Sequence, residues 1–172
     1  MKNQKGFSLI ELLIVVAIIL IIAAIAVPNL LKSKMAANEA SAAASERTIS
    51  TANVTYSSTY NNGFAQTLVS LGPPAAGAAT ASTSADLIDS VLAGASAANT
   101  AKSGYFFTYV PSGAAPATGY SSVGYPAGPG SSGTSAFCID QTNVLYKDPA
   151  PTAAPAPAAG AQCNSIATLL PM

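Results

Sequence analysis

The sequence predicts an α+β fold, in which one long N-terminal helix carries a head domain built on a small antiparallel sheet. Three observations indicate this. No polar side chain occurs between Leu12 and Val27, the residues that follow keep a helical spacing as far as Tyr60, and the second half contains short aromatic and β-branched runs between segments rich in Gly and Pro. A length of 172 residues suits one domain of ordinary size.

The apolar segment is long enough to cross a membrane. Counted back to Phe7 it has about 20 residues, the length that a helix needs to span the hydrocarbon core. Lys2 and Lys5 precede it and favour a cytoplasmic N-terminus, although Lys32 and Lys34 beyond its other end make the charge asymmetry modest.

One acidic residue, Glu11, lies inside this apolar segment. A carboxylate within a transmembrane helix costs roughly 2.5 to 3.5 kcal/mol, and less near the end of the helix. A secretory signal that is cut after Ala26 is one alternative reading of the segment, and a plain membrane anchor is another. Neither explains the acid, so we expect Glu11 to have a partner.

The segment that follows Pro28 has one face of mostly small residues that ends in large ones. Its members recur at steps of three and four residues: Met35, Asn38, Ala42, Ser45, Ile49, Ala52, Tyr56 and Tyr60. Glu39, Glu46 and Arg47 lie off the centre of this face. We expect its far end to be buried against the head, and Asn61-Asn62-Gly63 to end the helix.

The head is predicted to contain a short helix and four strands. Ser84 is a candidate N-cap, Asp86 would lie in the first turn, and Gly94 would end this helix. The strand candidates are Tyr105–Val110, Gly119–Tyr125, Ala136–Ile139 and Val144–Tyr146. The intervals between them are too short for crossover helices, so we expect antiparallel pairing.

The composition argues against an enzyme. Only 8% of the residues are charged, the formal net charge is zero, and His and Trp are absent, which excludes His-based catalysis and His metal sites. The charge balance gives no reason to expect nucleic acid as a partner. Asp140, Asn143 and Asp148 lack the spacing of a known calcium loop, and a hairpin turn explains Asp140 and Asn143. We therefore expect no cofactor and no metal.

The stretch Lys5-Gly6-Phe7-Ser8-Leu9-Ile10-Glu11, followed by an apolar helix with Pro28 just past it, resembles the N-terminus of type IV prepilins and pseudopilins. The resemblance implies a leader, residues 1–6, that prepilin peptidase removes between Gly6 and Phe7, and methylation of the new Phe7 amine. It also implies that Glu11 meets this amine on a neighbouring subunit, an ion pair that favours the assembled state.

The same resemblance implies a division of the rest of the chain. Residues 7–29 would form the transmembrane and polymerisation half of the helix, residues 30–61 its amphipathic half, and residues 62–172 an extracytoplasmic head. Pro28 either loosens the helix in an assembled fibre, as the resemblance implies, or marks a helix end at the membrane surface.

Two cysteines, Cys138 and Cys163, lie near the C-terminus. Beyond the inner membrane the environment is oxidising, and two cysteines admit one intramolecular pairing, although two unconnected thiols remain an alternative. In pilins a C-terminal disulfide encloses a surface-exposed loop, and by this resemblance the bridge would close the Pro/Ala-rich loop from Asp148 to Gly160.

The resemblance leads us to expect a structural subunit of a type IV pilus, polymerised by an assembly platform and its ATPase, for adhesion, twitching motility or DNA uptake. It would lie in the inner membrane before assembly and in a surface filament afterwards. A pseudopilin that acts as the periplasmic piston of a type II secretion system is the first alternative, and a secreted binding module is the second. The paired cysteines and the loop before Cys163 favour the pilin.

Overall fold

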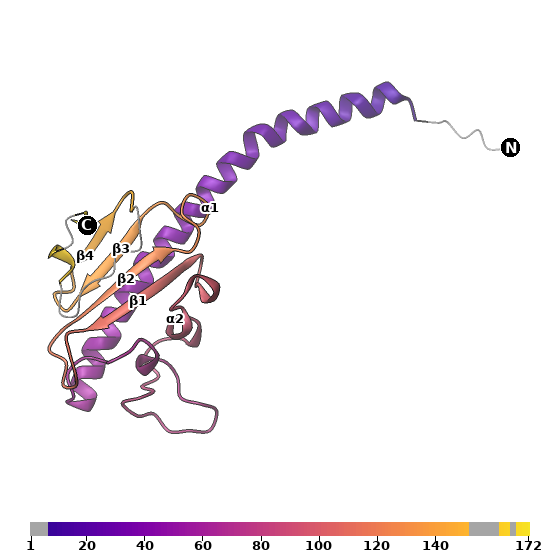
Figure 1. Ribbon diagram of the computed structural model, residues 1–172. Coiled ribbons are helices and arrows are strands. Elements are labelled where there is room, and N and C mark those ends of the chain that lie inside the picture. Colours follow the sequence, from indigo (N-terminus) through magenta and orange to yellow (C-terminus); the bar gives the residue numbers. More distant parts are fainter. Residues whose placement is uncertain (1–6, 152–161, 166–167) are drawn as a thin grey trace. The chain divides into compact units, whose positions relative to one another are not determined.

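The computed structural model describes residues 7–151, 162–165 and 168–172, and the chain divides into two compact units, Met1–Lys34 and Met35–Met172. Gly6 lies outside the described residues, as does most of the Pro/Ala-rich loop before Cys163. Helix α1, Leu9–Tyr60, begins in the first unit and provides the first element of the second (Figure 1).

In the first unit α1 is built mostly from Leu, Ile, Val and Ala, so the helix presents apolar side chains all round. Pro28 lies inside α1, so the alternative that it marks a helix end is wrong. Because proline has no N–H, the carbonyl of Ala24 receives no hydrogen bond from residue 28.

In the second unit the centre of the predicted face of α1 is confirmed, but the buried face is wider than predicted, since Glu46, expected off its centre, is fully buried. The buried residues of the helix are Ala42, Ser45, Glu46, Ile49, Ser50, Ala52, Asn53 and Tyr56. The helix ends at Tyr60, and Asn61 takes a positive φ of 49° while its N–H donates to the carbonyl of Ser57 at 3.1 Å. This left-handed residue just past the end is a common way to finish a helix, and it confirms the predicted stop.

The sheet has five antiparallel strands in the order β1-β2-β3-β4-β5. They are β1 Tyr105–Pro111, β2 Tyr120–Pro126, β3 Ala136–Asp140, β4 Leu145–Asp148 and β5 Leu170–Pro171. The first four confirm the predicted strands and their antiparallel pairing. The fifth was missed, because two residues carry no alternation pattern that a sequence could reveal.

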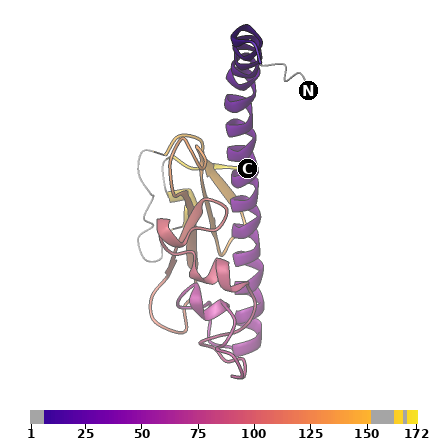
Figure 2. The ribbon, with the colours of Figure 1, turned by 90° about the vertical axis from the view of Figure 1, so that its right-hand side faces the viewer.

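The register gives the sheet two distinct faces. Phe107, Gly124 and Phe137 are cross-strand neighbours and share the face that packs on α1, whose second half lies along the sheet in Figure 2. Val123 and Cys138 belong to the opposite face and form a smaller cluster with Cys163, Leu169 and Tyr146. The larger core therefore lies between helix and sheet.

The predicted helix beginning at Ser84 is wrong in its start. Helix α2 is Ser90–Gly94, and its N-cap is Asp89, whose carboxylate accepts from the Leu92 N–H at 2.9 Å. Asp86 has a positive φ of 57°, which no helix residue adopts. The backbone from Ala85 to Ile88 donates instead to carbonyls of residues 70–72, so a tertiary pairing replaces the first helical turn.

Candidate functional site

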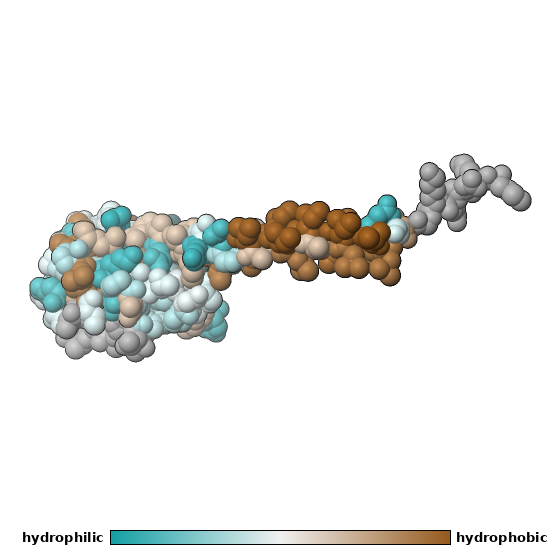
Figure 3. Space-filling view, turned by 90° about the horizontal axis from the view of Figure 1, so that it is seen from above, coloured by the Kyte–Doolittle hydropathy of each residue, from teal (hydrophilic) through white to brown (hydrophobic). Residues whose placement is uncertain are grey.

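The first unit presents an apolar surface that the chain does not cover. From Leu9 to Leu31 every side chain except that of Ala23 is exposed, and the apolar stretch appears as a continuous brown surface in Figure 3. A contiguous apolar surface of this size marks contact with a membrane or with other protein. By length and composition α1 is able to cross a membrane, a property that signal sequences share.

Glu11 has a local partner that sequence reasoning missed. The backbone N–H of Ser8 donates to its carboxylate at 2.9 Å, and the Ser8 carbonyl accepts from Leu12. Ser8 is thus the N-cap residue and Glu11 is the third helical residue, which is one half of a capping box. The spacing Ser-x-x-Glu before an apolar run was the signal that could have revealed it.

A carboxylate at this position also suits the helix N-terminus electrostatically, because the free N–H groups of the first turn carry partial positive charge. Phe7 lies just before the cap and is 81% exposed. Its backbone nitrogen lies three covalent bonds from the Ser8 nitrogen, whose N–H donates to the Glu11 carboxylate. Phe7 and Glu11 therefore lie together at the N-terminal end of α1.

Pro28 shares α1 with Glu11 but not its surroundings. The two residues are seventeen positions apart, roughly 25 Å along a helix at 1.5 Å per residue. Among the described residues, those predicted for processing and assembly therefore do not converge on one pocket. They mark the beginning and the far part of one exposed apolar helix.

The second candidate site is confirmed as a disulfide. Cys138 in β3 and Cys163 in the short 3-10 helix Cys163–Ser165 are bonded, with their Cα atoms 5.8 Å apart. The alternative of two unconnected thiols is therefore wrong. The bond ties the C-terminal segment to the sheet face opposite α1.

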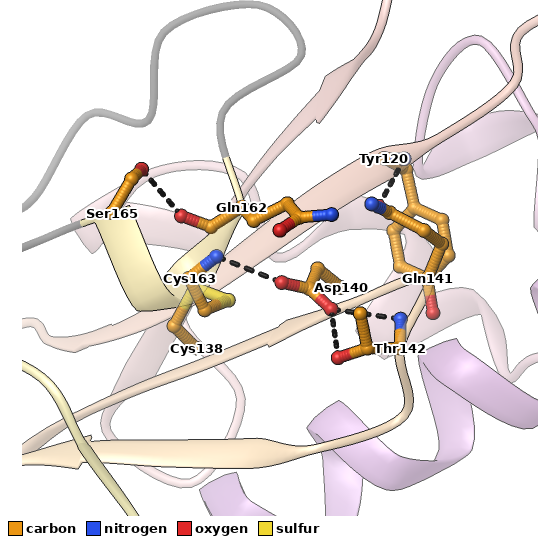
Figure 4. The surroundings of a disulfide bond; sticks show 8 residues. All are labelled: Tyr120, Cys138, Asp140, Gln141, Thr142, Gln162, Cys163 and Ser165. Carbon is orange, nitrogen blue, oxygen red and sulfur yellow. Dashed lines mark hydrogen bonds between the residues drawn. A yellow bond between two sulfur atoms is a disulfide. The ribbon is translucent and has the colours of Figure 1, made fainter.

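Asp140 lies two residues after Cys138 in β3, and its side chain binds the segment that carries Cys163 (Figure 4). One oxygen of its buried carboxylate accepts from the Cys163 N–H at 2.8 Å, and the other accepts from the N–H and hydroxyl of Thr142 at 2.8 and 2.6 Å. The turn that follows closes with the Asn143 N–H on the Asp140 carbonyl. The bonds of Asp140 to Thr142 and Asn143 confirm the predicted turn. Its bond to Cys163 was not predicted.

A second carboxylate, Glu39, joins α1 to the sheet. It accepts from the Thr134 N–H and hydroxyl at 2.9 and 2.8 Å, from the Ser135 N–H at 3.2 Å, and it pairs with Lys147 at 3.4 Å. Burial alone would raise the pKa of this carboxyl, but the hydrogen bonds from Thr134 and the charge of Lys147 lower it below its ordinary value. Glu39 is therefore ionised at neutral pH.

In the part of the chain that the structure describes, no group of three or more Cys, Asp or Glu side chains gathers in a way that could hold a metal ion. Asp140 and Asp148 use carboxylate oxygens to accept backbone N–H bonds, from Cys163 and Ala150 among others.

Comparison with known proteins supports the reading of the N-terminus. The family model described as the prokaryotic N-terminal methylation motif matches residues 1–27. The chain is 62% identical over 39 residues to the type IV wide pilus major component PilA4 of Thermus thermophilus. That match covers 23% of this chain and 30% of the relative, so it spans less than a third of the relative's length. No solved structure matches the chain.

Proposed function

We propose that this chain, a type IV pilin-like protein by its N-terminal motif and its α+β fold, is a structural subunit that polymerises through α1 into a surface filament. The observation that carries the proposal is the methylation motif of residues 1–27 continued by a helix whose apolar surface is exposed from Leu9 to Leu31. Such a surface needs a membrane before assembly and neighbouring helices afterwards.

Processing creates the assembling end. Prepilin peptidase hydrolyses the Gly6–Phe7 peptide bond on the cytoplasmic side, and a methyl donor then modifies the released amine of Phe7. The amine keeps its positive charge after a single methylation. It pairs with Glu11 of the neighbouring subunit in the filament, where a carboxylate with a cationic partner is much less costly than one without.

Glu11 has two consecutive tasks in this scheme. In the single chain it accepts from the Ser8 N–H and caps α1. In the filament a carboxylate with two oxygens keeps that bond and accepts from the neighbouring Phe7 amine as well. Pro28 leaves the Ala24 carbonyl without its helical donor, so we infer that the segment before it is the part of α1 that unwinds when subunits stack.

The remaining roles follow from assembly. The partners are other copies of the chain, the prepilin peptidase, and the assembly platform with its ATPase. Adhesion, twitching motility or DNA uptake would be the work of the filament, and the subunit itself would perform no catalysis. The chain would lie in the inner membrane before assembly and at the cell surface afterwards.

A pseudopilin of a type II secretion system is the second candidate, because it would share the N-terminal motif. The disulfide of Cys138 with Cys163, and the long loop it encloses, favour the pilin. A secreted module cut after Ala26 would discard Phe7, Glu11 and the whole exposed apolar run, which leaves their presence without a purpose.

The test is non-reducing mass spectrometry of the intact protein in filaments sheared from the native cell surface. The proposal expects a species that begins with N-methylated Phe7 and is lighter by two hydrogens for the disulfide. Processed protein confined to the cell envelope would favour the pseudopilin. A soluble species that begins at Val27 would overturn both.

A further inference from the structure

The second unit contains a carboxyl group that neither assembly nor the disulfide uses. Glu46 lies on α1 and is 0% exposed. The donors nearest to its carboxyl are the Ser122 hydroxyl and the Gly124 N–H on β2, but neither reaches either oxygen with hydrogen-bond geometry. The Ser122 and Tyr120 hydroxyls are likewise buried without a partner among the described residues.

The sheet face toward α1 offers this carboxyl no cation. That face comprises Tyr105, Phe107 and Tyr109 of β1, Tyr120, Ser122 and Gly124 of β2, Phe137 and Ile139 of β3, and Leu145 and Lys147 of β4. Of the described side chains on it, Lys147 alone is cationic, and Lys147 pairs with Glu39. On α1 itself Arg47 is adjacent to Glu46 but exposed.

Burial without a cation favours the neutral acid. An ionised carboxylate loses its hydration on entering a core and is stable there only when paired, so burial raises the pKa of Glu46 to about 8. Ser122 and Gly124 lower this pKa, but by less than burial raises it. Burial also raises the pKa of Tyr120, and the Glu46 carboxylate contributes to that rise. The tyrosines on this face are therefore neutral wherever Glu46 titrates.

The strand is shaped to accept the carboxyl. Gly124 stands in the middle of β2, where a Cβ atom would lie 3.2 Å from Oε1 of Glu46 and 3.0 Å from Cε1 of Phe107. Both distances are tighter than ordinary van der Waals contact, so a side chain at this position would displace the acid or the ring. The glycine provides the space in which the Glu46 side chain fits against the strand.

We propose that Glu46 is held as a neutral carboxylic acid between α1 and β2, and that loss of its proton in mildly alkaline solution loosens the packing of the second half of α1 on the sheet. The protonated acid is a donor as well as an acceptor, so it is able to donate to the unpartnered Ser122 hydroxyl. The ionised form lacks that proton and leaves an unpaired charge in the core. The inference concerns the second unit, Met35–Met172, and does not depend on filament assembly.

The sign of the pH dependence follows from linkage. The folded chain holds the Glu46 proton up to about pH 8, whereas the unfolded chain releases it near 4.5. The stabilising contribution is therefore fully present below about pH 4.5, decreases steadily as the pH rises through this window, and is lost above about pH 8. Glu39, whose pKa is lowered, gives the opposite sign, with a contribution that is lost in acid.

The first experiment measures urea unfolding of the full chain in detergent micelles by near-ultraviolet circular dichroism, which reports the aromatic side chains of the head, between pH 5 and pH 9. We expect the urea midpoint of the wild type to fall by roughly 1 M across this range. Glu46→Gln should remove most of the fall and unfold at higher urea than the wild type at pH 8. Glu39→Gln, the matched control on the same helix, should leave the fall unchanged.

A fall of the same size in Glu46→Gln and in the wild type, or a flat wild-type profile, would overturn the proposal. A second measurement keeps the test open if Glu46→Gln does not fold. Infrared spectra of the wild type labelled with ¹³C-glutamate should show a protonated carboxyl band at pH 7 that disappears above about pH 8. The chain has three glutamates, and the Glu39→Gln sample removes one other source of the band. Absence of a protonated glutamate at pH 7 would rule the proposal out.

Discussion

The two halves of α1 have opposite relations to water although they belong to one helix. From Leu9 to Lys34 the sequence is the most apolar of the chain, yet all its side chains except that of Ala23 are exposed. From Met35 to Tyr60 the helix is rich in Ala, Ser and Thr, yet it supplies Ile49, Tyr56 and a fully buried Glu46 to the core. Apolar content alone therefore does not tell which half packs within the chain.

The outward side of the second half shows how a polar sequence suits an exposed helix. The hydroxyls of Thr48, Thr51 and Thr55 donate to the carbonyls four residues back at 3.0 to 3.1 Å. Each hydroxyl is satisfied by its own helix, so this side needs no further partner in the chain. The Leu, Ile and Val side chains of the first half have no such bonds within the helix. They are stabilised only by burial away from water.

The largest expected effect is on the free energy of unfolding, and one matched pair of isoleucine substitutions compares the two halves of α1. Ile49 is 0% exposed and Ile18 is 52% exposed. We expect Ile49→Ala to lower the free energy of unfolding of the head by roughly 4 kcal/mol, because it opens a cavity between helix and sheet. Ile18→Ala should leave that free energy unchanged in micelles. Equal losses for the two variants would contradict the division.

The next effect concerns the far side of the sheet. Removing the disulfide by Cys138→Ala with Cys163→Ala should cost roughly 3 to 4 kcal/mol of head stability, since the bond closes a loop with a sequence separation of 25 residues. Membrane insertion of the first half should be unaffected. Urea unfolding and membrane fractionation of the same variant check both expectations, and a loss of insertion would show that the halves are coupled.

At Glu11 we expect a smaller loss of free energy, in the pairing between subunits, that is detected as a lower filament yield. Glu11→Gln keeps an oxygen that accepts from the Ser8 N–H but removes the charge, so α1 should remain capped. Filament yield should fall at least about tenfold, which corresponds to roughly 1.4 kcal/mol of lost pairing between subunits. The processed chain should still insert in the membrane. Normal filament yield from this variant would reduce the role of Glu11 to capping.

The smallest effect is expected at Glu39 in acid. Hydrogen bonds and Lys147 lower its pKa against the opposing effect of burial, so its contribution is present above the ordinary carboxyl pKa of 4.5 and is lost as the pH falls below it. Glu39→Gln should cost about 1 kcal/mol at pH 7 and less at pH 3. Unfolding at both values checks this, and an equal cost at both would contradict the ionised state.

Much of the fold could be predicted because its signals are local. The helical spacing from Met35 to Tyr60, the asparagines that end the helix, and the four longer strands are patterns within short stretches of chain, and the structure confirms them. The start of α2 could not be predicted in this way. Ser84 is a good cap by type, but the backbone after it pairs with residues 70–72, and nothing near Ser84 records that distant pairing.

The candidate sites divide in the same manner. The motif around Phe7 and Glu11 is contiguous, and the cap formed by Ser8 and Glu11 could have been read from their spacing. The bond from Asp140 to Cys163 joins residues 23 positions apart, and Glu39 reaches Thr134 across 95. These hydrogen-bond partners depend on how the strands are arranged in the folded chain, so the sequence near each residue does not predict them.

By itself the sequence determined the long helix, the four longer strands, the methylation motif and the apolar run, because each depends on propensity and periodicity over a few neighbouring residues. Only the tertiary structure decided which acids are ionised, paired or neutral. Glu39 and Glu46 stand on the same helix, yet Lys147 and Thr134 meet the first, while the second meets Ser122 and Gly124. The charge of a buried acid depends on the groups that folding brings to it.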